Sequence, residues 1–236
     1  EPSRGDATCR ATEAIRRAFA DLRVTLARAR QYPDLARFLV GRIFYTDAAN
    51  TIIAFMGIYV TREVGFSETQ AQIVLLIGIV GAVVGGLGWG TVVDRLGPKR
   101  ALNLVLGVWA IALLTAVMIA YLRLPNVLFW TVAPLAGVAL GGTWAADRPY
   151  MLRLSPPRHL GQFYGLYAMV GRFAAITGPL IWTAMVDWLG WGRPTAVLSL
   201  LVMIAAAFVV LRPVSDTRRV WQTEELVPRV QSSSSP

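Results

Sequence analysis

Six long apolar runs constrain the fold of this chain more than any other feature of its sequence. They cover about residues 38–60, 70–93, 101–122, 127–146, 161–187 and 195–212. A helix needs roughly 20 mostly apolar residues to cross the hydrocarbon core of a bilayer, and these runs have about that length. Because lipid cannot satisfy an irregular backbone, such runs fold as helices. The sequence therefore predicts an all-α membrane protein with six transmembrane helices.

The composition agrees with a membrane bundle and leaves little room for an enzyme. Hydrophobic residues make up 55% of the chain and charged residues 16%, and the runs lie too close together for a soluble domain between them. No Walker-type phosphate loop or nucleophile elbow is present, and the glycines of residues 85–88 lie inside an apolar run. His159 and Cys9 are the only residues of their types, so we expect no disulfide within the chain, no metal site and no cofactor.

Basic residues gather on one side of the predicted spans. The amino-terminal segment, the loops after the second and fourth spans, and the tail hold 18 of the 23 Lys and Arg residues, whereas the opposite loops hold Arg62, Arg123 and Arg193. Because short basic loops stay in the cytoplasm, both chain ends are predicted to be cytoplasmic. A basic inner surface facing anionic membrane lipid accounts for the net charge of +9, so no nucleic-acid partner is needed.

The two ends are expected to lie outside the bundle of residues 35–212. Residues 1–34 lack the apolar stretch of a signal peptide and place apolar side chains on one narrow helical face, at Ile15, Phe19, Leu22 and Leu26. They predict a cytoplasmic amphipathic linker helix that lies on the membrane or packs under the bundle. Residues 213–236, which end in a serine run, predict a disordered cytoplasmic tail.

The loop between the second and third spans carries an ordered set of glycines and charges. A turn at Gly97-Pro98 separates two pairs of charges, Asp94-Arg95 and Lys99-Arg100, and Gly90 precedes them. This pattern resembles the signature loop of the major facilitator superfamily, which joins the second and third helices of each six-helix half. The resemblance implies a conformational role for Gly90, Asp94, Arg95, Gly97, Lys99 and Arg100.

Other stretches resemble the vacuole effluxer branch of that superfamily. They are Phe44 to Ala54, Gly65-Phe66-Ser67, Gly141-Gly142 leading to Arg148, Pro156-Pro157, Gln162 to Tyr167, and Gly178-Pro179. The resemblance implies two three-helix repeats that form the carboxy-terminal half of a twelve-helix fold, with the amino-terminal half missing from this chain. Arg172 stands where we expect the family to favour Lys, which keeps the charge and changes its geometry.

Two ionisable side chains fall well inside the predicted spans. Asp47 lies near the middle of the first span and shares a helix face with Asn50 and Thr51, while Arg172 lies near the middle of the fifth. An intramembrane charge indicates a functional site, so we predict a substrate or ion pathway at Asp47, Asn50, Thr51 and Arg172. The alternative is that both charges only tie helices together, with Arg172 paired to Asp47. Arg42 lies nearer the span end and is expected to snorkel.

Small residues and prolines indicate where helices approach or bend. The second span has two small-xxx-small pairs, Gly81 with Gly85 and Gly86 with Gly90, which predict close packing and sliding against a neighbour. Gly137 with Gly141 gives a weaker version in the fourth span. Gly178-Pro179 predicts a break or kink that serves as a hinge. Arg148 and Arg153, after the fourth span, are candidates for a cytoplasmic gate.

Two functions fit these observations. The first is secondary transport of a small solute across a membrane, most simply a bacterial inner membrane, with amino acids suggested by the resemblance and the missing half supplied by the same chain or another. The second is a transport-inactive half-bundle that acts as a structural subunit or assembly factor in a larger membrane complex.

Overall fold

A computed structural model describes residue 23 and residues 25–216. Six long helices account for most of them: α2 (Pro33–Arg62), α3 (Glu68–Leu96), α4 (Pro98–Tyr121), α5 (Phe129–Leu154), α6 (Leu160–Thr183) and α7 (Arg193–Leu211). Shorter turns join them: 3-10 turns at Asn126–Leu128 and Pro157–His159, and a π-helical turn at Ala184–Trp188. Six spans, each containing one of these helices, are long and apolar enough to cross a membrane, and the described part of the chain contains no strand. The predicted fold class is confirmed.

The predictions for the two ends fall mainly outside the described residues. Of the expected amino-terminal helix, residues 25–29 are described and helical, and Leu26 is exposed. Arg28 Nη1 donates a hydrogen bond to Gln162 Oε1 at 2.7 Å, which joins this segment to the start of α6. Ile15, Phe19 and Leu22 lie outside the described residues, as does the tail after residue 216.

Local sequence signals set the helix boundaries. Pro33 and Pro98 occupy the first turns of α2 and α4, where the missing N–H of proline costs no helical hydrogen bond. Ser67 and Gln70 form a capping box at the start of α3. Gly97 has φ of +87°, a conformation that favours glycine, and it separates α3 from α4 as the sequence predicted.

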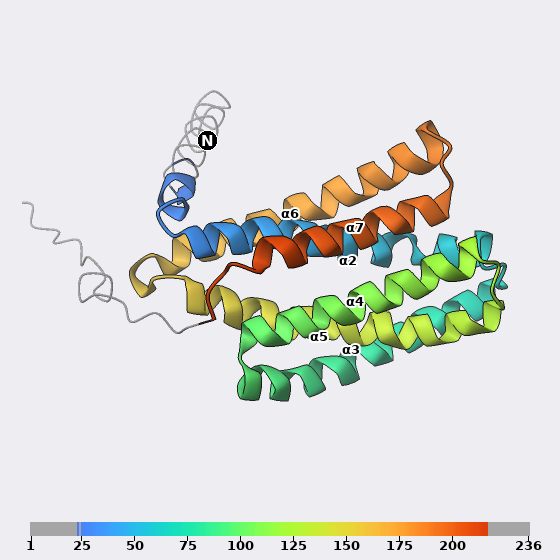
Figure 1. Cartoon of the computed structure of the whole chain (residues 1–236), viewed down its shortest axis with the longest axis horizontal. Coiled ribbons are helices and arrows are strands. Elements are labelled where there is room, and N and C mark those ends of the chain that lie inside the picture. Colours follow the sequence, from blue (N-terminus) through green and yellow to red (C-terminus); the bar gives the residue numbers. More distant parts are fainter. Residues whose placement is uncertain (1–22, 24, 217–236) are drawn as a thin grey trace, which may run out of the picture.

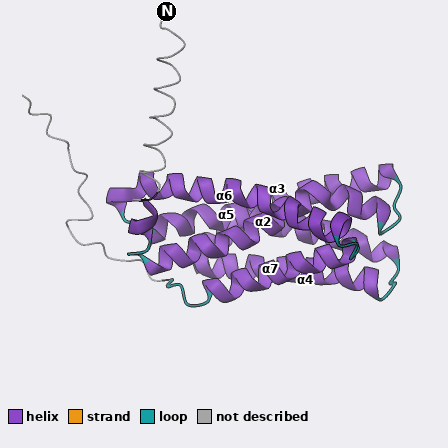
Figure 2. Cartoon of the chain, turned by 90° about the horizontal axis from the view of Figure 1, so that it is seen from above, coloured by secondary structure: helices purple, strands orange, loops and turns teal. Residues whose placement is uncertain are grey.

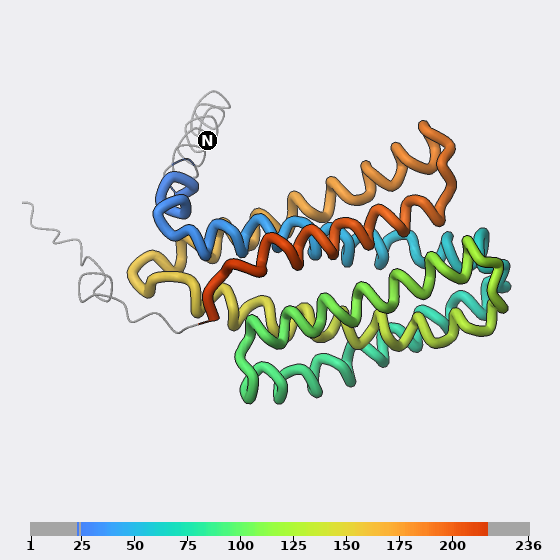
Figure 3. Tube along the Cα trace, in the orientation of Figure 1, coloured from blue at the N-terminus to red at the C-terminus, as the bar shows by residue number. Residues whose placement is uncertain are grey.

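The helices form two packed groups whose pairing supports the prediction of two repeats. Helix α2 packs against α6 and α7, helix α5 packs against α3 and α4, and α4 contacts α7 across the groups. Figures 1 and 3 show these two groups, and Figure 2 shows the helices running side by side along the long axis. The first helix of each three-helix repeat therefore packs against the second and third helices of the other. Exchanging the repeats leaves this pattern of contacts unchanged.

The closest helix contact joins α3 to α5 through glycines. A Cβ at Gly85 would lie 2.6 Å from the Val138 Cα, and one at Gly141 would overlap the carbonyl of Ala82. Close packing at Gly81 with Gly85 and at Gly137 with Gly141 is thus confirmed. The pair Gly86 with Gly90 differs, because Gly90 has no neighbour within 4 Å of its Cβ position. The expected sliding along this contact stays a prediction.

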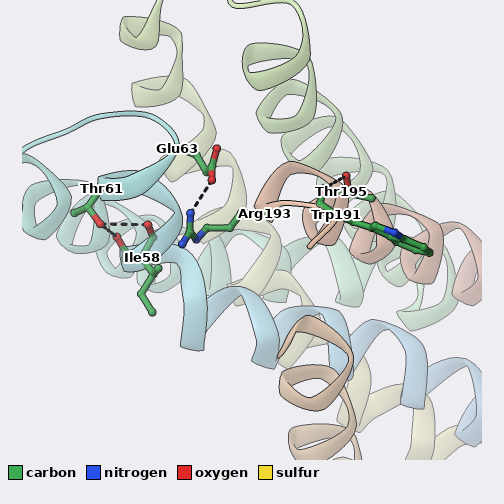
Figure 4. Close-up of polar contacts among 7 residues, drawn as sticks. Ile58, Thr61, Glu63, Trp191, Arg193 and Thr195 are labelled. Atoms are coloured by element: carbon green, nitrogen blue, oxygen red, sulfur yellow. Dashed lines mark hydrogen bonds and ion pairs between the residues drawn. The ribbon is translucent and has the colours of Figure 1, made fainter. Parts of the chain in front are cut away.

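The two ends of the bundle differ in their charged side chains. At one end, Arg193 Nη1 at the start of α7 pairs with Glu63 Oε1 just after α2 at 2.9 Å (Figure 4). The opposite end, which we call the basic end, carries the α3–α4 and α5–α6 connections and the two ends of the described chain (Figure 1). Its basic side chains include Lys99, Arg100, Arg153 and Arg158.

Candidate functional site

Asp47 lies at a tight contact between α2 and α6. Its side chain is buried, with 1% of the residue exposed, and Thr177 Oγ1 on α6 donates a hydrogen bond to Asp47 Oδ1 at 2.8 Å. The backbone of Gly178 also interacts with this carboxylate. A Cβ at Gly178 would lie 2.7 Å from Asp47 Oδ1, so glycine is needed for the two helices to approach. The Asp47 carboxylate is held by neutral groups.

The other predicted pathway residues lie at different depths. Thr51 is fully buried, and its hydroxyl donates to the backbone carbonyl of Asp47 at 2.8 Å, while Asn50 is half-buried. Arg172 is exposed on α6 and forms no ion pair among the residues that the structure describes. The Asp47–Arg172 pair considered from the sequence is therefore not formed. Asp47 and Thr51 share one buried face, as predicted.

The buried ion pair of the spans joins Arg42 on α2 to Asp147 on α5. Two phenols complete the site: Tyr45 OH donates to Asp147 Oδ1 at 2.5 Å and Tyr167 OH on α6 donates to Oδ2 at 2.8 Å. We call Arg42, Tyr45, Asp147 and Tyr167 the Asp147 cluster. The expectation that Arg42 snorkels was wrong, because only 8% of the residue is exposed and its charge is paired inside the bundle. The cluster ties three helices together.

The sequence did not reveal Asp147 because the fourth span seemed to end at residue 146. Helix α5 instead continues to Leu154, with Pro149 inside it. Arg148 and Arg153, predicted to lie after this span, are therefore on α5, and Arg148 is exposed. A helical signal was available: Tyr150, Met151 and Leu154 follow Asp147 at i+3, i+4 and i+7, and all three are buried.

The Arg42 guanidinium is only partly satisfied by its partners. Its Cζ atom lies 3.6 Å from the centroid of the Tyr167 ring, an arrangement typical of a cation–π contact. Its Nε atom is buried and has no hydrogen-bond partner. Gly171 on α6 leaves the space that the guanidinium occupies, because a Cβ there would lie 3.0 Å from Nη2. One donor of this buried cation is thus left without an acceptor.

The signature loop divides into a bound part and a free part. Lys99 Nζ donates to the backbone carbonyls of Arg212 and Val214, and Arg100 Nε pairs with Asp216 Oδ2 at 3.6 Å. By contrast, Asp94 and Arg95 are exposed and form no hydrogen bond or ion pair with other described residues. Gly90 at the other edge of the motif also has open space around it.

The bound part of the loop holds the segment Arg212–Asp216, which follows α7. Ser215 Oγ donates to Asp34 Oδ2 at 2.8 Å at the start of α2, and Tyr150 OH on α5 donates to the Ser215 carbonyl at 3.4 Å. A Cβ at Gly97 would lie 3.1 Å from Arg153 Nη1, so Arg153 covers the loop from α5. At the basic end, contacts within this chain therefore join α2, α4 and α5 to the segment after α7.

Gly178-Pro179 does not break its helix. Helix α6 runs through Pro179 to Thr183, and the π-helical turn Ala184–Trp188 continues it. Of the two expected outcomes, a break is wrong, while a kink that serves as a hinge stays a prediction. The tight contact of Gly178 with Asp47 and Thr51 gives this glycine a packing role as well.

An open apolar pocket of about 610 Å³ lies between α2, α3 and α5, with Trp109 of α4 also in its lining. Its lining includes Ile52 and Met56 from α2, Ile79 and Val83 from α3, and Leu140 and Trp144 from α5. Neither Asp47 nor Asp147 lines it. Within the described residues, no cluster of His, Cys, Asp and Glu could hold a metal ion.

Six long apolar helices and a buried Arg–Asp ion pair between two of them define a multi-pass membrane protein. The chain belongs to the vacuole effluxer Atg22-like family, whose model matches residues 1–223. It is 32% identical over 193 residues, 82% of its length, to the uncharacterized MFS-type transporter YxiO of Bacillus subtilis. It is 23% identical over 214 residues, 86% of its length, to autophagy-related protein 22 of Coccidioides immitis.

The chain covers 44% of the Bacillus protein and 36% of the Coccidioides protein, so it spans less than half the length of these relatives. No solved structure matches it.

Proposed function

We propose that this chain is the carboxy-terminal half of a secondary transporter that moves a small solute, with amino acids the first class to test, by alternating access. Arg172 carries the proposal. It lies in the middle of α6, exposed and without an ion-pair partner among the described residues. A charge at this depth in lipid is costly, so its face of α6 meets a water-filled cavity or another helical bundle.

Other observations agree with a second six-helix half against this face. The spans of α3 and α6 are the least buried of the six. Asp94 and Arg95 at the end of α3 have no partner among the described residues. In the proposed transporter, Asp94 and Arg95 contact the other half, Arg172 contacts an anionic group or serves as a counter-charge, and Asp47, Asn50 and Thr51 belong to the solute and cation pathway. The proposal puts both chain ends on the cytoplasmic side of a bacterial inner membrane.

A transport assay tests the proposal. This chain, reconstituted into vesicles together with the other six-helix half, is tested against the twenty standard amino acids one at a time. For at least one of them, it is expected to exchange the unlabelled amino acid inside the vesicles for the same labelled amino acid outside. Vesicles with Arg172→Ala serve as the matched comparison, and empty vesicles give the background. Exchange at background level across the panel would exclude amino acids as the solute class.

The second candidate function is a transport-inactive structural subunit or assembly factor. It is favoured by one observation, that Asp47 and Asp147 both have hydrogen-bond partners within this chain and that Asp147 also has its counter-charge there. Purification from native membranes distinguishes the two functions. A stable complex with unrelated membrane subunits, together with no exchange activity, would support the structural role.

A further inference from the structure

We propose that Asp147 is a proton-coupling site and that Arg42 is its exchangeable counter-ion. The inference rests on the proposed transport function for its coupling role, but the proton site itself can be tested without a solute. It assigns the proton to Asp147 and leaves Asp47 as a cation-contacting residue of the pathway.

The groups facing Asp147 come from each helix packed against it. Helix α2 supplies Arg42 and Tyr45, and helix α6 supplies Tyr167. Arg148, next to Asp147 on α5, also interacts with the Tyr167 phenol and is itself exposed. The core of the cluster therefore holds one anion, one cation and two neutral phenols, all buried. Adding one proton changes its net charge from zero to +1.

Such a change is coupled to helix position because the pair spans helices. When Asp147 becomes neutral, Arg42 is left as an unpaired charge inside the bundle, which is strongly unfavourable. Arg42 relieves this by moving to water or to another anion. Its long side chain, its unpartnered Nε and its place nine residues after the start of α2 allow that movement.

Prolines weaken the two helices that carry the other members of the cluster. Pro149 lies two residues after Asp147, and it cannot donate the helical hydrogen bond to the carbonyl of Ala145. Pro179 has the same effect further along α6, beyond Tyr167. Asp147 and Tyr167 therefore lie on helices that bend more easily than α2, whose only proline is in its first turn.

The proposed step transfers a proton from a hydronium ion of bulk water to one Asp147 carboxylate oxygen, which leaves a water molecule, as the ion pair with Arg42 separates. No other covalent bond changes. Release of the proton to water on re-forming the ion pair completes the cycle. Asp47 lacks this property, because its partners Thr177 and Gly178 are neutral and no counter-ion is released when its charge changes.

Infrared spectroscopy of the full-length protein in lipid vesicles tests the proton site directly. As pH falls, the carbonyl stretch of a protonated carboxyl group is expected to grow in the wild type, to lose one component in Asp147→Asn, and to keep that component in Asp47→Asn. Equal spectra for the wild type and Asp147→Asn would overturn the proposal. The double variant Arg42→Gln/Asp147→Asn, which leaves no unpaired charge, supplies folded protein if the single variant does not fold, and a missing component there counts in the same way.

Transport separates a coupling role from a structural one. With the solute found in the exchange assay, the double variant is expected to keep exchange and to lose accumulation driven by a pH gradient. Accumulation equal to that of the wild type would overturn the coupling role. If no solute exchanges even in the wild type, the proposed function fails for that panel, while the infrared component still decides whether Asp147 is a proton site.

Discussion

Asp47 and Asp147 are both buried aspartates in transmembrane helices, yet they are held in opposite ways. Asp47 is bonded by a threonine hydroxyl and backbone at a tight crossing of α2 and α6, without a counter-charge. Asp147 is paired with Arg42 and accepts two phenol hydrogen bonds from α2 and α6. The difference teaches that burial alone does not define a charge site, because the partners decide what happens when the charge is lost.

The largest effect expected is on stability when each aspartate becomes asparagine. Asp147→Asn leaves Arg42 buried without a counter-charge, which is expected to cost about 3–5 kcal/mol of unfolding free energy. Asp47→Asn leaves no charge unpaired and keeps an acceptor for Thr177, so its cost is expected to be about 1 kcal/mol. Thermal unfolding of the full-length protein in detergent measures both changes.

The double variant Arg42→Gln/Asp147→Asn is the control for that comparison. It should recover most of the stability lost in Asp147→Asn, since both charges are removed together. Equal losses of unfolding free energy in Asp147→Asn and Asp47→Asn would mean that the buried Arg42 charge does not need Asp147 as its counter-charge.

Tyr45, one of the two phenols that donate to Asp147, offers a smaller and more local change. Tyr45→Phe removes a buried hydrogen bond to a carboxylate, and hydrogen bonds to charged groups contribute about 1.5–3 kcal/mol. Tyr59→Phe is the matched control on the same helix, because Tyr59 OH donates to the neutral carbonyl of Ala116 at 3.2 Å and such bonds contribute about 0.5–1.5 kcal/mol. Equal losses in chemical denaturation would place Asp147 in its neutral form.

A change at Gly178 tests whether Asp47 depends on the close approach of α6. Gly178→Ala places a Cβ in contact with Asp47 and Thr51 and is expected to cost about 1–3 kcal/mol through overpacking. Gly165→Ala on the same helix is the control, since its Cβ meets nothing within 4 Å and alanine favours a helix. Similar melting temperatures for the two variants would show that the crossing relaxes easily.

The fold was largely accessible from the sequence, whereas the partners of the charges were not. Apolar length fixed the six spans, and Gly97-Pro98 fixed the turn between α3 and α4 because few residues other than glycine adopt φ of +87°. The shared face of Asp47 and Thr51 followed from helical spacing. The Arg42–Asp147 pair depends on how α2 packs against α5, which spacing within one helix does not give. Pro149 concealed it further, because a proline after a charged pair is typical of a loop.

Asp94 is a third aspartate that sharpens the comparison, because the described structure gives it no partner at all. Asp94→Ala should therefore change unfolding stability by no more than about 0.5 kcal/mol, unlike either buried aspartate. If the other half of a transporter binds this carboxylate in one conformation, the same variant removes a charge-assisted contact of about 1–3 kcal/mol and shifts the balance between conformations. Exchange in vesicles should then slow about 5- to 150-fold while the protein stays folded. Lys99→Ala, by contrast, is expected to lower the free energy of unfolding, because the Lys99 side chain holds the segment after α7. Normal exchange in Asp94→Ala would show that the free part of the signature loop has no conformational role.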